Sequence, residues 1–413
     1  MTALKGLRVV ELASERVAFA AKLLGDMGAD VILVEPPDGD PARAYPPFLD
    51  DQPGENRSLW WWHYNTSKRG VVIDLDLKEG RERFRQLIAS ADILLEAEPR
   101  ERLAALGLDY DDLRTIRSDL IHVAVTPYGR GDALSDLPAT DLTIMAASGP
   151  PWSCGYDDHS LPPIRGPMQA LHTAQHFAAM SALTAVLHRG VTGQGQFIDV
   201  SMTAASNVTT EAASYSWLVA EQTVQRQTGR HASTRPSGET QQLCADGRYA
   251  NTGVPPRAPK EFAALLAWLR ELGFIDDLPE AVFLEMGASW EGPFELSKLG
   301  SDDEITAIFG AGREALKLIA SRLPAQDFFL GCQRAGLAVG VVNSPEEAFE
   351  DEHFKARGFQ VPLHHDDFDR TITYPGAPYA MRGSPWAISR RAPHLGEHDA
   401  EVFGEIEEAS RSS

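Results

Sequence analysis

The N-terminal third of the chain alternates between short apolar runs and amphipathic segments. The apolar runs lack the alternation of a half-exposed strand, which is typical of strands buried on both faces of a sheet. Residues 19–30 and 78–91 between them have helical spacing of apolar positions. The pattern predicts an α/β fold with a parallel sheet covered by helices on both faces. The predicted strands are residues 6–12, 31–35, 71–77, 91–96 and 119–125.

The rest of the chain is less regular. A long apolar helix is predicted over residues 169–189, followed by a turn and a strand over 191–202. The polar stretch 226–240 reads as a linker, and a smaller α+β domain is predicted over 229–324. From residue 335 onward the sequence predicts mostly loops. Within the small domain we expect a hairpin over 243–253 and helices over 261–273 and 313–323.

Composition limits the possible partners. The 413 residues carry 59 acidic against 38 basic side chains, a net charge of −21 that repels nucleic acid. No apolar run approaches the roughly 18 residues of a membrane span, so we expect no membrane partner. The odd set of Cys154, Cys244 and Cys332 fits neither a disulfide framework nor a zinc spacing. A cytoplasmic protein is the expectation.

The turn after the first predicted strand reads ASERV, over residues 13–17. It contains no G-x-G-x-x-G fingerprint, so the sequence disfavours a nicotinamide enzyme in spite of the Rossmann-like pattern.

The stretch HTAQH places His172 and His176 four residues apart at the start of the long apolar helix. A zinc site would lack the glutamate of HExxH and a third ligand, so no metal is predicted. Two interpretations stay open. His172 could act as a base or acyl carrier, or both histidines could line a polar patch of a packed helix.

An ordered series of segments resembles one family over essentially the whole chain. These segments resemble the family III CoA-transferases, the group of formyl-CoA transferase and carnitine CoA-transferase, which is related to α-methylacyl-CoA racemase. Each piece is short, but the order of the pieces is specific. They are RVVELA with LLGDMGADVILVEPPDGDPAR, SLWWWHYNTSKRGVVIDLDLKEGR, ATDLTIMAASG, AAMSALTAVLHRGVTGQGQFIDVSM, DEHFKARGF and APHLGEHDAEVF.

The resemblance implies a fold and an assembly. A large Rossmann-like domain would be built from both chain ends, residues 1–228 and the returning segment 325–413, with the small domain at 229–324 between them. Two such protomers would interlock as a dimer. The substrates would be coenzyme A or an acyl-CoA, with no covalently bound cofactor, and a small carboxylic acid.

The resemblance also implies which residues meet coenzyme A. Arg43, Lys68 and Arg69 match positions that bind its polyanionic nucleotide end, and an acidic protein would need such cations. Tyr128 and Gly129 match a short segment after the fifth strand, at the edge where open sheets place ligands.

Further matches concern the acyl site. Trp60 stands where relatives place an aromatic side chain that lines it, whereas Trp61 and Trp62 are predicted to be buried. Asp141 matches an acidic position near the site, and the alternative is that Asp141 caps the following helix. A racemase-like histidine before this acid is absent, because Thr140 stands there.

The family's nucleophile is an aspartate four residues before a glycine, at the start of the long helix. The match places Leu171 at the aspartate and Gln175 at the glycine, and leucine cannot be acylated. His172 follows directly and, like Asp141, is a catalytic candidate.

Four functions follow. The chain could be a transferase that uses Asp141 as a displaced nucleophile, or the nucleophile-lacking subunit of a two-gene transferase, as in the benzylsuccinate CoA-transferase. It could also be an acyl-CoA isomerase, racemase or lyase-like enzyme, or a non-catalytic CoA-ester binding protein. The partner would be a second copy in a homodimer or a paralogous subunit in a heterodimer.

Overall fold

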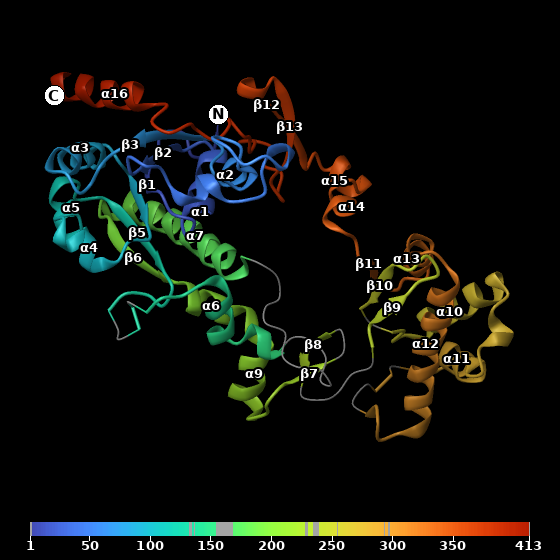
Figure 1. Cartoon of the computed structure of the whole chain (residues 1–413). Helices are drawn as coiled ribbons and strands as arrows, with labels where there is room; N and C mark the ends of the chain where they lie inside the picture. The colour runs from blue at the N-terminus through green and yellow to red at the C-terminus, as the bar shows by residue number, and fades with distance from the viewer. Residues whose placement is uncertain are drawn as a thin grey trace. The chain divides into compact units, whose positions relative to one another are not determined.

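A computed structural model describes the chain except for residues 1, 132–133, 136, 154–167, 228–229, 234–238, 254, 293, 296–297 and 413. It divides into two compact units. The first comprises Met1–Trp152, Pro163–Glu211 and Phe349–Ser413, and so contains both chain ends, and the second comprises Ser153–Pro162 and Ala212–Ala348. Figure 1 shows the elements of both units.

A six-stranded sheet forms the centre of the first unit, in the order β3-β2-β1-β4-β5-β6. Every neighbouring pair is parallel, which confirms the predicted α/β class. The order is that of doubly wound sheets, in which ligands bind beyond the carboxyl ends of the strands. The strands are β1 (Arg8–Leu12), β2 (Asp30–Glu35), β3 (Lys68–Val72), β4 (Ile93–Glu96), β5 (Ile121–Thr126) and β6 (Gln196–Ser201).

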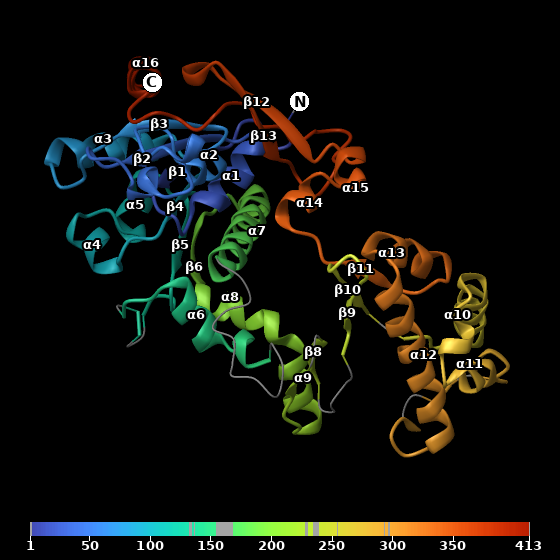
Figure 2. The same cartoon turned by 45° about the vertical axis from the view of Figure 1, so that its right-hand side comes forward.

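Helices cover both faces of this sheet (Figure 2). On one face, α1 (Ala18–Asp26) and α7 (Gln169–Thr192) pack with the side chain of Val9. The next residue, Val10, belongs to the opposite core with α3 (Lys78–Ala89) and α16 (Asp399–Ser412). Alternate residues of each strand are therefore buried on opposite faces, which explains the continuous apolar runs in the sequence.

The chain returns to the first unit near its C-terminus. The side chains of His398 and Asp399 accept hydrogen bonds from the backbone N–H groups of Gly70 (3.1 Å) and Val72 (2.9 Å) in β3, so the last helix is tied to the sheet edge. Shorter elements complete the unit: α2 (Leu59–Tyr64), α4 (Arg100–Ala105), α5 (Tyr110–Ile116), α6 (Asp141–Ser148), α8 (Met202–Asn207) and α15 (Glu352–Ala356).

The bounds of the third predicted strand are wrong. β3 covers Lys68–Val72 rather than residues 71–77. The strand ends early because Asp74 begins a turn, in which its carboxylate and carbonyl accept the N–H groups of Asp76 (3.0 Å) and Leu77 (3.3 Å). It begins early although its first two residues are charged, because Lys68 pairs with the fully buried Glu11 and Arg69 pairs with the partly exposed Asp30.

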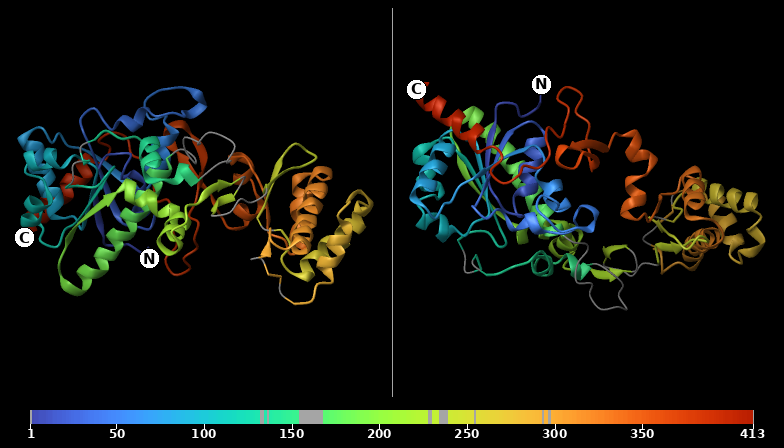
Figure 3. Two further views of the ribbon diagram at one scale, coloured as in Figure 1. Left: turned by 90° about the horizontal axis from the view of Figure 1, so that it is seen from below. Right: turned by 45° about the horizontal axis from the view of Figure 1, so that its top comes forward.

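The second unit packs helices around a small sheet in the order β11-β10-β9 (Figure 3). The predicted hairpin is formed by β9 (Gln241–Leu243) and β10 (Tyr249–Thr252), which pair antiparallel. A core of leucines, phenylalanines and Trp268 holds the unit together. The remaining elements are α9 (Glu211–Ala220), α10 (Pro259–Leu272), α11 (Ala281–Ala288), α12 (Asp303–Arg322), α13 (Ala325–Arg334), β11 (Val339–Val341) and α14 (Pro345–Phe349).

Two local expectations are wrong. Within the expected linker, β7 (Gln225–Gln227) and β8 (Arg230–Ser233) pair antiparallel. The expected loop region after residue 335 contains the hairpin of β12 (Gln360–His365) and β13 (Arg370–Pro375). The strands β7 and β8 are too short and polar to produce an apolar alternation. In the second hairpin, Val361 and Leu363 alternate with polar residues or proline, and so do Ile372 and Tyr374, so this signal was missed. No helix in the described part of the chain is long and apolar enough to cross a membrane.

Candidate functional site

The first turn of α7 holds the residues that the sequence places at the acyl site. Leu171 is buried, and its backbone N–H donates to Oδ1 of Asp141 at 3.1 Å. The alternative that Asp141 caps its own helix is wrong, because Thr140 is the N-cap of α6 and accepts the Thr143 N–H. Asp141 instead reaches across to the N-terminus of α7, where a carboxylate is favoured by the helix dipole.

His172 lies in an aromatic cluster. Its Nε2 is 2.7 Å from the hydroxyl of Tyr64, and its ring stacks on Phe19 with centroids 4.8 Å apart. Burial lowers the pKa of His172 and raises that of Tyr64 to about 12. At neutral pH the phenol therefore keeps its proton and the imidazole is neutral, and the tautomer of the ring decides which of the two groups donates the hydrogen bond.

The second histidine has a different environment. His176 is exposed, and its Nδ1 is 2.7 Å from the carbonyl oxygen of His172. Gln175, one residue earlier, is buried, and its Oε1 accepts the backbone N–H groups of Phe19 (2.7 Å) and Ala20 (3.3 Å) at the start of α1. Within the described ranges, no three potential metal ligands gather in one place.

The three consecutive tryptophans Trp60, Trp61 and Trp62 lie in different environments. Trp61 and Trp62 are 3% and 4% exposed, in agreement with the prediction that they are buried. Trp60 is half-buried, and its ring lies 4.3 Å from that of Tyr64, which in turn contacts His172. The structure thus joins Trp60 to the first turn of α7 through Tyr64.

The side chain of Arg43 forms an ion pair with the buried carboxylate of Glu35. Its Nε and Nη2 donate to the two oxygens of Glu35, each at 2.7 Å, and Nη2 also meets the carbonyl oxygen of Pro393. The guanidinium lies over the ring of Trp61 at 4.0 Å. Glu35 is the last residue of β2 and is fully buried, so the pair is positioned by the strand end.

Lys68 is fully buried. Its ammonium meets the carbonyl oxygen of Ala18 at 2.9 Å, Oδ1 of Asn65 at 2.8 Å and Oε2 of Glu11 at 2.7 Å. These contacts use all three ammonium donors, so none is left for a phosphate. Burial raises the pKa of Glu11 to about 7 although Lys68 opposes this shift.

Arg69 forms a network with acidic side chains at the outer edge of the sheet. It contacts Asp30 on β2 at 2.7 Å, and Glu401 and Glu405 on α16 at 2.9 and 2.7 Å. These bonds raise the pKa of Arg69. The network attaches the C-terminal helix to the sheet.

Tyr128 and Gly129 form a turn directly after β5. Gly129 has φ +86°, and a Cβ atom there would lie 3.3 Å from Oδ2 of Asp199, so the turn needs glycine. The same oxygen accepts the N–H of Arg130 at 2.8 Å. Within the described residues, no hydrogen bond or ion pair joins Tyr128 or Gly129 to the aromatic cluster around His172.

Sequence reasoning missed Tyr64, Phe19, Glu11 and Glu35. Tyr64 could have been found, because it lies four residues after Trp60 and therefore on the same face of α2. Glu11 and Glu35 gave no signal, since an acidic residue within a predicted strand does not reveal the basic side chain that it contacts.

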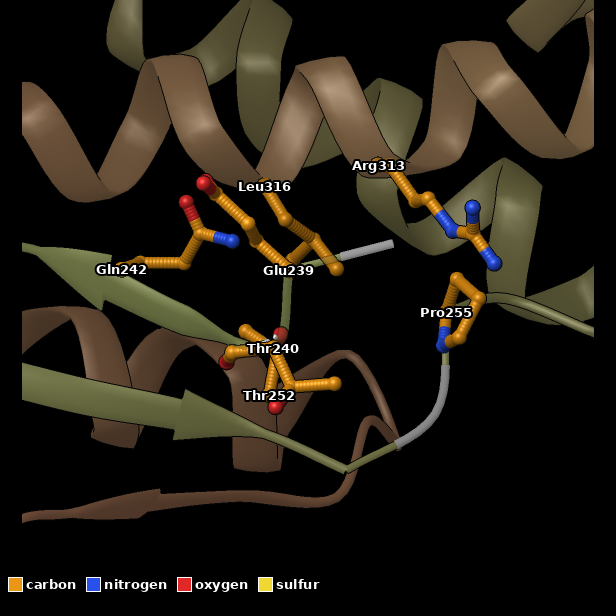
Figure 4. A pocket seen from close by; sticks show the side chains of 7 residues that line it. All are labelled: Glu239, Thr240, Gln242, Thr252, Pro255, Arg313 and Leu316. Carbon is orange, nitrogen blue, oxygen red and sulfur yellow. Dashed lines mark hydrogen bonds between the residues drawn. The ribbon is translucent and has the colours of Figure 1, made fainter. Parts of the chain in front are cut away.

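Figure 4 shows a small hollow in the described part of the second unit. It has a volume of about 20 Å³, which is room for one water molecule and not for a pantetheine arm. Its lining residues are Glu239, Thr240, Gln242, Thr252, Pro255, Arg313 and Leu316.

Comparison with known proteins identifies the family. The model of CoA-transferase family III matches residues 4–399. The succinyl-CoA:(R)-benzylsuccinate CoA-transferase subunit BbsE of Thauera aromatica is 33% identical, with 96% of this chain and 93% of that protein covered. The succinate–glutarate CoA-transferase of Agrobacterium fabrum (strain C58 / ATCC 33970) is 30% identical, with 99% and 97% covered.

Solved structures agree on the fold. A CAIB/BAIF family protein from Brucella suis superimposes with a TM-score of 0.79 at 24% identity, covering 98% of this chain and 99% of that one. Rv3272 from Mycobacterium tuberculosis gives a TM-score of 0.72 at 21% identity, with 97% and 99% covered. The match of the family model over residues 4–399 shows that the chain belongs to CoA-transferase family III.

Proposed function

We propose that this chain is the nucleophile-lacking subunit of a hetero-oligomeric CoA-transferase, which moves coenzyme A from an acyl-CoA to a small carboxylic acid. The observation that carries the proposal is the buried Leu171 in the first turn of α7. Family chemistry needs a carboxylate at the matched position to form a mixed anhydride, and a hydrocarbon side chain cannot form one.

The comparisons support the subunit role. The relative from Thauera aromatica is named as one subunit of its transferase, and it resembles this chain over nearly the full length of both. A competent paralogue with aspartate at the Leu171 position would supply the acylation step.

Exposed apolar side chains support association with a partner chain. On α7, Met180, Leu187 and Val191 are 56%, 74% and 89% exposed, and on α9 Trp217 and Leu218 are 58% and 78% exposed. Exposure of several apolar side chains on one helix, as on α7, is typical of protein interfaces rather than of a free monomer surface.

The contacts of the basic residues refine the predicted coenzyme A site. We keep Arg43, Tyr128 and Gly129 as proposed nucleotide contacts, because the Arg43 side chain is 16% exposed and the turn lies at the carboxyl edge of the sheet. Lys68 and Arg69 hold the fold through their ion pairs, which supports a structural role for both.

A second candidate function rests on Asp141. Its carboxylate lies 3.1 Å from the backbone nitrogen of Leu171, the position matched to the family nucleophile. Its other oxygen has no hydrogen bond within the described residues, so it could attack a thioester. The chain would then be a complete transferase with a displaced nucleophile.

Transferase assays separate the two functions. The purified chain is tested alone and with the paralogue from its own genome, with succinyl-CoA as the donor and hydroxylamine as the trap. The subunit role predicts turnover only in the mixture, and no loss when the chain carries Asp141→Asn. Turnover by the chain alone that is abolished by Asp141→Asn would replace this role by the second function.

A further inference from the structure

The C-terminal segment closes one edge of the parallel sheet. β3 is an outermost strand of this sheet, so the N–H groups on its free side need acceptors from outside the sheet. Those of Gly70 and Val72 donate to the side chains of His398 (3.1 Å) and Asp399 (2.9 Å). The backbone N–H of His398 in turn donates to the carbonyl oxygen of Gly70 at 2.9 Å. The ring of His398 is therefore one of two side chains that satisfy the free edge of β3.

The same contact fixes the start of α16. A Cβ atom on Gly70 would lie 3.0 Å from Cβ of Pro393, so the chain crosses directly over this glycine before it reaches the helix. The carbonyl oxygen of His398 accepts the N–H of Val402 in the first turn of α16. Val402 is fully buried in the apolar core that α16 shares with α3. His398 thus joins the last helix to the strand on which it packs (Figure 1).

Both ring nitrogens of His398 face donors. Nδ1 accepts the N–H of Gly70, and Nε2 lies 3.0 Å from Nη1 of Arg390, which can only donate. A neutral imidazole has one lone pair to offer, and a protonated imidazole has none. Protonation would therefore remove the acceptor that Gly70 uses and place a second cation beside the guanidinium.

Four charged side chains surround this ring. They are Arg390 and Glu397 on the segment before α16, Glu401 in the first turn of α16, and Arg69 on β3. Burial lowers the pKa of His398, and the two arginines lower it further, whereas the two glutamates oppose the shift. The ring in contact with β3 is thus neutral at pH 7, and it binds a proton less readily than a histidine in water does.

The ion pairs of α16 respond differently to mild acid. Glu405 contacts Arg69 at 2.7 Å and Arg8 at 2.8 Å. Hydrogen bonds from Arg69 lower the pKa of Glu405, so these pairs keep their charges when the pH falls below 7. Of the contacts formed by His398 and Glu405, the one made by the histidine is therefore the one that changes near neutral pH.

We propose that His398 is a pH-sensitive switch in the attachment of the C-terminal helix. The neutral imidazole holds α16 and the segment before it on the edge of β3, and protonation of the ring loosens this contact. The inference does not depend on the proposed subunit role, because it concerns a local opening of the chain and not acyl transfer.

Hydrogen–deuterium exchange of the full-length protein tests the switch. Rates are compared at pH 7.0 and pH 5.5 and corrected for the effect of pH on amide exchange itself. Below the usual histidine pKa of 6.5, the open segment binds a proton that the closed one does not, so opening becomes more favourable as the pH falls. Peptides of β3 and α16 should open up to about tenfold more often per pH unit, whereas α12 of the second unit should not. Equal opening of β3 and α16 at both pH values would overturn the proposal.

Two variants assign the effect to the ring. His398→Asn keeps an acceptor for the Gly70 N–H and suits the position before a helix, but it does not titrate, so the pH-dependent opening should disappear. His353→Gln, the exposed control on α15, should behave as the parent does. The same rise in His398→Asn as in the parent would contradict the proposal.

Arg390→Gln provides a second variant at an exposed position. It removes a cation that opposes protonation of the closed ring, so the rise in opening between pH 7.0 and pH 5.5 should become smaller without being abolished. An unchanged or larger rise would show that the charge next to His398 does not govern the opening, and would also overturn the proposal.

Discussion

The two units of this protein bury different kinds of side chain. The buried polar residues that the structure describes in the second unit are the uncharged Thr240, Gln242 and Thr252. The first unit buries ionisable side chains around its sheet and first helix: Glu11, Lys22, Asp26, Glu35, Asp40, Lys68, Arg69, Glu96 and His122. An apolar core needs only volume and pattern, whereas buried charges require specific partners.

The buried glutamates of the sheet have similar positions and partners. Glutamates lie at or near the carboxyl ends of β1, β2 and β4, and each contacts a basic side chain at 2.7 to 2.8 Å. The pairs are Glu11 with Lys68, Glu35 with Arg43, and Glu96 with Arg130. Arg43 and Arg130, which follow the carboxyl ends of β2 and β5, are thus engaged by the protein's own carboxylates.

The largest effect is expected from the buried pair of the first unit. Lys68→Met leaves the Glu11 carboxylate without its partner in the core, and should lower the free energy of unfolding by about 3–5 kcal/mol. Urea unfolding of both proteins measures the difference. Combining the change with Glu11→Gln should recover most of the loss, since no charge is then buried. If the protein with Lys68→Met alone were as stable as the parent, the ion pair between Lys68 and Glu11 would not be formed.

A core change in the second unit should cost slightly less and show no dependence on pH. Leu269 is fully buried in the core of that unit, and Leu269→Ala should cost about 3 kcal/mol through lost burial and the cavity left behind. Unfolding measured at pH 6 and pH 8 should give the same difference from the parent. A pH-dependent cost would reveal an ionisable contact in this core.

A smaller effect, counted per pH unit, is expected from His63 on acidification. Burial lowers its pKa from 6.5 to about 3, so below pH 6.5 the unfolded chain binds a proton that the folded chain does not. Stability is therefore complete above pH 6.5 and falls as the pH is lowered, by at most about 1.4 kcal/mol per pH unit for this group. His63→Gln should flatten that slope between pH 6.5 and pH 4, whereas His353→Gln, an exposed control on α15, should not. Equal slopes in all three proteins would refute the assignment.

The smallest effect is expected from an exposed ion pair of the second unit. Arg270 and Glu285 lie 2.6 Å apart but are 55% and 53% exposed. Arg270→Ala should change the free energy of unfolding by less than about 1 kcal/mol, because water and salt screen such pairs. A loss as large as that of Lys68→Met would remove the contrast between the two units.

Much of the fold could be predicted from the sequence, since strands buried on both faces give continuous apolar runs, as β2 and β5 do. β3 was misplaced because Lys68 and Arg69 read as surface charges until their partners are known. For the candidate site, the sequence singled out Asp141, Leu171 and His172, and the structure brings the Asp141 carboxylate to the first turn of α7, which holds the other two. Tyr64 and the role of Gln175 as an acceptor for α1 depend on contacts between distant segments, which local patterns do not contain.

The most direct test of the account is the mass of the intact chain after incubation with succinyl-CoA. The unmodified chain should show no acyl adduct, whereas the folded Leu171→Asp variant should gain one that hydroxylamine removes and that peptide mapping places at position 171. An adduct of the same kind on the unmodified chain would contradict the claim that this subunit lacks a nucleophile.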